Sequence, residues 1–387
     1  MSKQNHDRKK QLQKRYAKQF RQSRKVAQKT QQRTEEIRHS VVRFAKKHSK
    51  AGMIILSVAV LLAMLLGGLF SCAMMVGSRI SGMFAATYTA ADPAMLDAEA
   101  AYCSMEEDLQ ETIDAIESTY PGYDGYSYDL DEIGHDPYVM ISMLSALHGG
   151  EFTLEEVQSD LELIFANQYT LTLTERSAAI WVGDGYQIET TLHVTLDNLG
   201  TDRLPSILLT EEQLSSYAAY MSTLGNREDL FAGVPGASTL KEPEYYEIPP
   251  EALEDETFAA MIAEGEKYLG YPYVWGGSSP STSFDCSGFV CWVINHSGWS
   301  VGRTTAQGLF NLCTPVSSSQ AKPGDLIFFK GTYDTTEVSH VGIYVGGGQM
   351  LHCGDPISYA NVNVPYWQEH FYCFGRLSGI PDNLPYQ

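Results

Sequence analysis

Two side chains in the last third of the chain have the types and surroundings that nucleophilic catalysis needs. The first is Cys286, which precedes an apolar run of helical composition (289–294) that ends at Gly298. Asp285 or Ser283 can cap such a helix, which places Cys286 in its first turn. There the helix dipole favours a thiolate and lowers the pKa of the thiol. Cys286 is therefore predicted to be a nucleophile for acyl transfer.

The second side chain is His340, in a segment (339–345) whose alternation predicts a strand. Three glycines (346–348) form a turn, and residues 349–353 return as a second strand. This pairing places His352 next to His340 and about one residue out of line. A second imidazole there can fix the tautomer and tilt of the first. Nucleophile, base and orienting group then follow the logic of a Cys-His-Asn triad.

Each of these residues has a plainer interpretation when it is taken alone. A cysteine at the start of a helix is usually a small buried residue, and a histidine on a strand is usually only packed. Their joint occurrence, each in the structural context that catalysis requires, favours an active site.

The elements that must position this site lie in a chain with a strongly uneven charge. The net charge is −20, yet residues 1–50 contain 17 of the 27 Lys and Arg residues and only 3 of the 47 Asp and Glu residues. The rest of the chain therefore carries −34, which excludes nucleic-acid binding by that part because phosphate contacts need cations. The basic tail has two interpretations, a solvated segment on anionic lipid or a docking segment for a partner protein or DNA.

Residues 53–76 separate the tail from the acidic part and contain no charged side chain. A helix of this length spans roughly 36 Å, enough for a ~30 Å hydrocarbon core. We therefore expect a transmembrane helix within 51–77, with Cys72 as an ordinary membrane cysteine. Lys46, Lys47 and Lys50 precede it, which predicts a cytoplasmic N-terminus and an extracytoplasmic remainder. A signal peptide cleaved among the small residues at 85–90 is the alternative.

The pattern along the chain predicts six segments. They are a basic cytoplasmic tail (1–50), the span (51–77), a juxtamembrane spacer (78–93), an α+β domain (94–232), a Pro- and Gly-containing linker (233–256) and a catalytic domain (257–387). The α+β domain has helical patterns first and then an antiparallel pair around 171–173 and 192–196. It contains no nucleophile–base pair, so we expect a spacer or interaction domain.

The cysteines give no sign of a disulfide framework or of a metal site. Seven cysteines occur without compact spacing, in domains large enough to build their own cores. No CxxC or HxxxH spacing occurs, so the sequence predicts no structural zinc.

The last third of the chain resembles the NlpC family of papain-like cysteine peptidases, which cut the peptide stems of bacterial cell walls. The resemblance covers about 257–377 and rests on motifs in family order: PYVWGG (272–277), FDCSGFV (284–290), RTTAQ (303–307), KPGDLIFF (322–329), SHVGIYVG (339–346) and MLHC (350–353). It implies an α+β fold in which a helix carrying the cysteine packs on an antiparallel sheet carrying the histidine.

The resemblance also implies roles for single residues. Cys286 is the expected nucleophile, His340 the general base and His352 the third, orienting residue. The substrate-binding residues expected are Tyr273 beside the nucleophile, Asp285 for the amino end of the stem peptide, and Ser287. The reaction implied is hydrolysis of the bond between D-glutamate and the following diamino acid, with no metal or organic cofactor.

The layout of the whole chain resembles wall hydrolases carried by integrative conjugative elements of Gram-positive bacteria. It implies a single-pass protein of the cell membrane that faces the wall and opens it for a DNA-transfer channel, with conjugation-channel proteins as partners. Two alternatives stay open. The first is an amidase or acyltransferase, since the same fold supports both, and the second is a scaffold with little catalytic activity.

Overall fold

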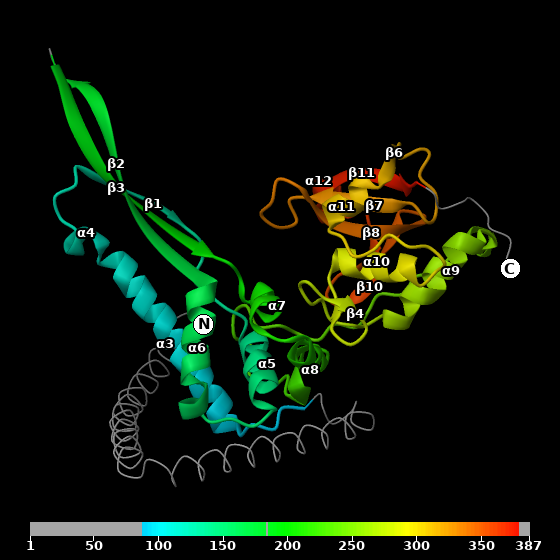
Figure 1. Cartoon of the computed structure of the whole chain (residues 1–387), viewed down its shortest axis with the longest axis horizontal. Coiled ribbons are helices and arrows are strands. Elements are labelled where there is room, and N and C mark those ends of the chain that lie inside the picture. Colours follow the sequence, from blue (N-terminus) through cyan, green and yellow to red (C-terminus); the bar gives the residue numbers. More distant parts are fainter. Residues whose placement is uncertain (1–86, 183–184, 379–387) are drawn as a thin grey trace, which may run out of the picture.

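The computed structural model describes residues 87–182 and 185–378 (Figure 1). The predicted basic tail and membrane span lie outside these residues. Among the described residues no helix combines the length and the apolar composition needed to cross a bilayer. We call residues 87–232 the middle domain and residues 244–378 the C-terminal domain.

The middle domain is mainly helical, and capping residues set where its helices begin. The principal helices are α3 (Asp92–Asp114), α4 (Ile116–Thr119), α5 (Pro137–His148), α6 (Leu154–Gln168), α7 (Leu204–Leu208) and α8 (Glu211–Met221). Thr153 and Glu156 form a capping box at the start of α6. Gly149 ends α5 at a φ of 71°, which glycine adopts without steric cost.

A three-stranded sheet of order β1-β3-β2 completes this domain. The predicted antiparallel pair is confirmed as β2 (Tyr169–Val182) and β3 (Gly185–Asn198), with Leu171 opposite Leu196. The two strands form a long hairpin that projects away from the helices (Figure 1). Strand β1 (Gly125–Leu130) pairs parallel to β3 and was not predicted, because its short run has no clear alternation of apolar residues.

The boundary predicted between spacer and domain at residue 94 is wrong. Tyr88 and Ala90, assigned to the spacer, are buried in the apolar core of the middle domain. The Tyr88 N–H donates to the carbonyl of Gly225 at 3.1 Å, and its hydroxyl lies 2.7 Å from Ser142 Oγ. A short segment that packs by one aromatic ring carries no periodic pattern, so the sequence did not reveal it.

The predicted linker also differs from expectation because it packs on both domains. Ser238 N–H donates to Asp136 Oδ2 of the middle domain at 3.1 Å. Further along, the Glu244 carbonyl accepts from Tyr359 N–H of the C-terminal domain at 3.0 Å, and Ile248 enters that domain's core. The linker leads into η3 (Pro250–Glu254), α9 (Glu256–Gly265) and η4 (Glu266–Tyr268). Asp255 caps α9 and separates it from η3.

The C-terminal domain is a six-stranded antiparallel sheet of order β10-β9-β8-β7-β11-β6. The strands are β6 (Cys313–Val316), β7 (Leu326–Lys330), β8 (Val338–Gly346), β9 (Gln349–Cys353), β10 (Ile357–Asn361) and β11 (Phe371–Leu377). A short pair, β4 (Ser278–Ser279) and β5 (Ser283–Phe284), precedes α10 (Cys286–Asn295), and α11 (Ala306–Asn311) and α12 (Pro365–His370) complete the domain.

Helix α10 packs against strands β8 and β9 through a shared apolar core. Phe289 and Val293 of the helix are completely buried, as are Val341 and Leu351 of the sheet. Burial of side chains of this size contributes about 1.5–3 kcal/mol each, which fixes the helix on the sheet. The expected α+β arrangement, a cysteine-bearing helix on a histidine-bearing antiparallel sheet, is confirmed.

Candidate active site

Cys286 is the first residue of α10, as its sequence context predicted. Asp285 caps the helix, and its Oδ1 accepts from Gly288 N–H at 2.6 Å. The cysteine is only 6% exposed. Its Sγ lies 3.9 Å from the carbonyl oxygen of Ser339, and the N–H of Val341 also interacts with the sulfur. The thiol therefore lies against strand β8 between the two residues that flank His340.

The two histidines of the hairpin β8–β9 contact each other directly. His340 Nε2 lies 2.9 Å from His352 Nδ1, and both rings are buried. His352 lies opposite Gly342 in the strand pairing. Its offset from His340 is therefore two residues, whereas the sequence predicted an offset of about one. An irregularity between Tyr344 and Gly346 changes the register. Diagonal neighbours on one sheet face still approach closely enough for rings to meet.

This hydrogen bond sets the chemistry of His340. When its Nε2–H donates to His352, the other nitrogen, Nδ1, has a free lone pair and can accept a proton. In the other tautomer His352 Nδ1–H donates and His340 Nε2 accepts, so the proton-accepting role of Nδ1 belongs to the first arrangement. In both arrangements the bond to His352 holds the His340 ring in place.

Trp367 of α12 covers both rings and was not anticipated from the sequence. Its ring stacks on that of His340 with a centroid distance of 5.3 Å and an interplanar angle of 30°. It meets the ring of His352 edge-on at a centroid distance of 5.2 Å. It also packs on Phe329 of β7. No spacing rule connects a residue 15 positions beyond His352 to the hairpin, so only the fold reveals this contact.

Tyr273 lies beside the nucleophile. Its hydroxyl interacts with both the thiol and the N–H of Cys286. Burial, with the neighbouring Cys286 and Asp285, holds the pKa of Tyr273 above its ordinary value, so the hydroxyl keeps its proton and can donate.

Asp285 and Ser287 belong to a polar cluster that already satisfies them. Ser287 Oγ donates to Asp285 Oδ1 at 2.9 Å, and Arg303 pairs with Asp285 Oδ2 at 2.5 Å. Arg303 also donates to Ser287 Oγ at 2.9 Å. The carboxylate expected to receive an amino group is therefore already bound by a guanidinium. Arg303 opens the RTTAQ motif and was not identified as a site residue.

The pKa of the nucleophile differs from expectation. Burial, reinforced by the Asp285 carboxylate, raises the pKa of the Cys286 thiol to about 12. The N–H groups of Val341 and Ser287 oppose this effect without outweighing it. The prediction that the helix N-terminus lowers the pKa of Cys286 is therefore wrong for the resting site. Burial destabilises the thiolate by more than the N-terminus of one helix stabilises it.

The two imidazoles are held neutral by the same physics. Burial lowers the pKa of His352 to about 4. Burial, and repulsion from His352 whenever that ring is protonated, hold the pKa of His340 well below its ordinary value. The resting site thus holds a neutral thiol at the start of α10 and a neutral pair of imidazoles on the neighbouring hairpin.

The middle domain contributes to the surroundings of this site. Arg203 of the short helix η1 (Thr201–Arg203) lies over Trp275 at 4.7 Å and over Tyr333 at 5.3 Å from the ring centroids. Val274, between Tyr273 and Trp275, is buried in the apolar core of the middle domain. The loop that carries Tyr273 is therefore held from both sides.

Fold and site together define a domain of the cysteine peptidase type. Residues 270–376 match the model of the NlpC/P60 family.

Similar proteins share this part of the chain. One is the bifunctional muramidase/DL-endopeptidase CwlT of Bacillus subtilis, with 43% identity over 121 residues, 31% of this chain and 36% of that protein. Another is the probable endopeptidase p60 of Listeria grayi, with 45% identity over 122 residues, 31% of this chain and 23% of that protein. The chain thus spans well under half the length of these relatives.

A solved structure, of a Staphylococcus aureus protein described as similar to lipoprotein, NLP/P60 family, aligns with 63% of this chain and 71% of its own. Its identity is 26% and its TM-score 0.31. The family match and the relatives agree with the resemblance of residues 257–377 to NlpC-type peptidases, and both relatives are named as endopeptidases.

Proposed function

We propose that the protein is a membrane-anchored cysteine endopeptidase that cuts peptidoglycan stem peptides between D-glutamate and the following diamino acid. The observation that carries this proposal is the placement of Cys286 against the strand of His340, with His352 bonded to the second nitrogen of that ring. The names of the relatives, a DL-endopeptidase among them, support the choice of bond.

The proposed reaction begins with the neutral thiol of Cys286 and the neutral imidazole of His340. As Cys286 Sγ attacks the carbonyl carbon, its proton moves to Nδ1 of His340, and the thiolate forms only in that step. His352 Nδ1, accepting from His340 Nε2–H, stabilises the imidazolium. Protonated His340 then gives the proton to the leaving amine, and a thioester remains on Cys286.

The oxyanion of the tetrahedral intermediate needs donors beside Cys286. The N–H of Cys286 and the hydroxyl of Tyr273 lie next to each other there and supply two. In the second half of the reaction His340 removes a proton from water, which attacks the thioester. The stem peptide is released with a free γ-carboxyl on D-glutamate, and the thiol is restored.

Substrate binding is proposed to involve residues of both domains. For the amino end of the stem to bind Asp285 and Ser287, it displaces the Arg303 guanidinium that contacts both of them. Arg203 of the middle domain offers a cation for a carboxylate of the stem beside Trp275.

The location of the enzyme is proposed from the sequence. The uncharged segment 53–76 anchors it, and the cations before this segment keep the N-terminus cytoplasmic, so the site faces the wall. From the layout of the chain we propose that local wall opening serves a conjugative DNA-transfer channel. A catalytically inactive variant should then reduce transfer of the element.

The function is tested by mass spectrometry of purified muropeptides after incubation with the full chain or its Cys286→Ala variant. The wild type should release fragments cut after D-glutamate, and the variant should release none. Fragments cut at the sugar-linked amide would indicate an amidase instead. Absence of any cleavage by the wild type would contradict the proposal and favour a scaffold.

A further inference from the structure

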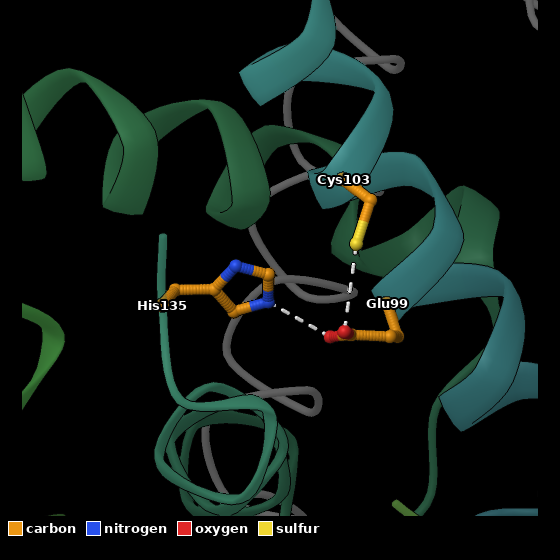
Figure 2. A group of neighbouring side chains, drawn as sticks. All are labelled: Glu99, Cys103 and His135. Carbon is orange, nitrogen blue, oxygen red and sulfur yellow. Dashed lines mark hydrogen bonds and ion pairs between the residues drawn. The ribbon is translucent and has the colours of Figure 1, made fainter. Parts of the chain in front are cut away.

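A second group of chemically reactive side chains lies in the middle domain, outside the site described above. Glu99 and Cys103 stand one turn apart on α3, and His135 reaches them from the loop between β1 and α5 (Figure 2). His135 Nε2 lies 2.9 Å from Glu99 Oε2, and Cys103 Sγ lies 3.5 Å from Glu99 Oε1. The carboxylate, sulfur and imidazole nitrogen all fall within 4.8 Å of one another.

The second nitrogen of His135 is held by a separate carboxylate. Its Nδ1 lies 3.0 Å from Glu106 Oε1, and the hydroxyl of Tyr169 donates to that same oxygen at 2.6 Å. This arrangement fixes the ring and directs Nε2 toward Glu99 and Cys103. A carboxylate on the outer nitrogen is the usual partner of a metal-binding histidine.

The surroundings keep these groups from bulk water. The side chain of His135 is 4% exposed and that of Glu99 13% exposed. The Tyr102 ring packs against the imidazole with a centroid distance of 4.6 Å. Soft and nitrogen donors that are shielded in this way suit a borderline-soft ion better than Mg²⁺ or Ca²⁺.

We propose that Glu99, Cys103 and His135 bind a Zn²⁺ ion through a carboxylate oxygen, a thiolate and Nε2. Binding releases the thiol proton of Cys103 and any proton on His135 Nε2, while Nδ1–H stays with Glu106. Water completes the tetrahedral coordination. The ion links α3 to the segment before α5, so its role is to stabilise the middle domain.

The competing interpretation is an ion pair without a metal, in which His135 simply bridges Glu99 and Glu106. The two interpretations differ at Cys103. An ion-paired histidine needs no sulfur, whereas the zinc site requires the thiolate as a ligand. Metal titration of the cysteine variant therefore separates them.

The experiment titrates the metal-stripped full chain with Co²⁺ and records the thiolate-to-cobalt charge-transfer absorption. We expect a band that saturates at one equivalent and disappears when Zn²⁺ is added. Cys103→Ser should lose the band. Cys313→Ser and Cys286→Ser should keep it, because Cys313 and Cys286 lie in the C-terminal domain. Far-UV circular dichroism and muropeptide cleavage of Cys103→Ser establish that this variant is folded.

A second variant tests the outer carboxylate. Glu106→Gln keeps the size of the side chain but weakens its bond to Nδ1, and should lower Zn²⁺ affinity about tenfold. Absence of a band in the wild type, or a band that survives Cys103→Ser, would overturn the proposal and leave the ion pair as the explanation.

Discussion

Each of the two domains places a histidine near a cysteine in shielded surroundings, yet one imidazole is neutral and the other is protonated. His340 meets a second imidazole and the Trp367 ring, and its pKa is held low. His135 meets two carboxylates. Burial alone would lower the pKa of His135 as well, but bonds to Glu106 and Glu99 raise it to about 10.

The opposite pKa shifts of His340 and His135 show that burial alone does not decide the protonation of a histidine in this molecule. Neighbouring charges decide it, because a carboxylate in contact stabilises the imidazolium by more than desolvation costs. A neutral ring can accept the proton of a thiol, as the active site requires. A ring already protonated cannot, so the middle domain's pair is unsuited to nucleophilic catalysis in the metal-free state.

The largest expected effect comes from removing the neutral ring. His340→Ala should lower kcat/KM for muropeptide cleavage by at least about 1,000-fold, since it deletes the base that takes the thiol proton. The matched control is His135→Ala, which should leave kcat/KM within about twofold because His135 touches no part of the site. If both variants lost the same fraction of kcat/KM, the assignment of catalysis to His340 rather than to His135 would be wrong.

The neutral state of His352 predicts a dependence of stability on pH. Its folded pKa of about 4 lies below the ordinary value, so its contribution is full above about pH 6.5 and is lost as the pH falls toward 4. The loss for the C-terminal domain is on the order of 3 kcal/mol. Urea unfolding followed between pH 7 and 4 measures it, and His352→Gln should show a shallower decline. An unchanged decline in that variant would contradict the assignment.

The orienting role of His352 gives a smaller effect on rate. His352→Ala should lower kcat about 100-fold, because His340 loses the acceptor that fixes its tautomer. His352→Asn offers a replacement acceptor and should recover part of the loss. If Asn and Ala variants were equally impaired, His352 would be a packing residue rather than an orienting one.

The smallest expected effect concerns the contact between the domains. Arg203→Ala should raise KM about fivefold at unchanged kcat, because it removes the cation proposed to pair with a stem carboxylate, and an exposed ion pair is worth up to about 1 kcal/mol. Arg227→Ala is the control, since Arg227 pairs with Asp92 and Asp229 elsewhere on the middle domain. An effect of Arg203→Ala confined to kcat would contradict a role in binding.

Local sequence signals predicted the parts of the site that depend on neighbouring residues. Asp285 before Cys286 predicts the start of a helix. The alternation around His340, with the three glycines that follow, predicts a hairpin. Signals of the same local kind are the capping boxes Thr153–Glu156 of α6 and Thr210–Gln213 of α8.

Contacts made by tertiary packing were beyond such signals. Trp367 reaches the histidines from a helix after β10, and Arg203 reaches Trp275 from another domain. His135 meets Cys103 only because the fold brings α3 to the loop before α5, so no spacing motif indicated a metal site. The pKa of Cys286 was misjudged because its burial is a property of the folded state and not of the helix start.

The proposed mechanism has Cys286, activated by His340, attack the γ-carbonyl of D-glutamate. We would expose the full chain to a stem-peptide analogue that carries a chloromethyl ketone at that carbonyl, which forms a stable thioether with a thiolate and releases chloride, and map the modified peptides by mass spectrometry. We expect rapid modification of Cys286, slow modification of Cys286 in His340→Ala, and none of Cys103. Modification of another cysteine in place of Cys286, or a rate at Cys286 unaffected by loss of His340, would contradict it.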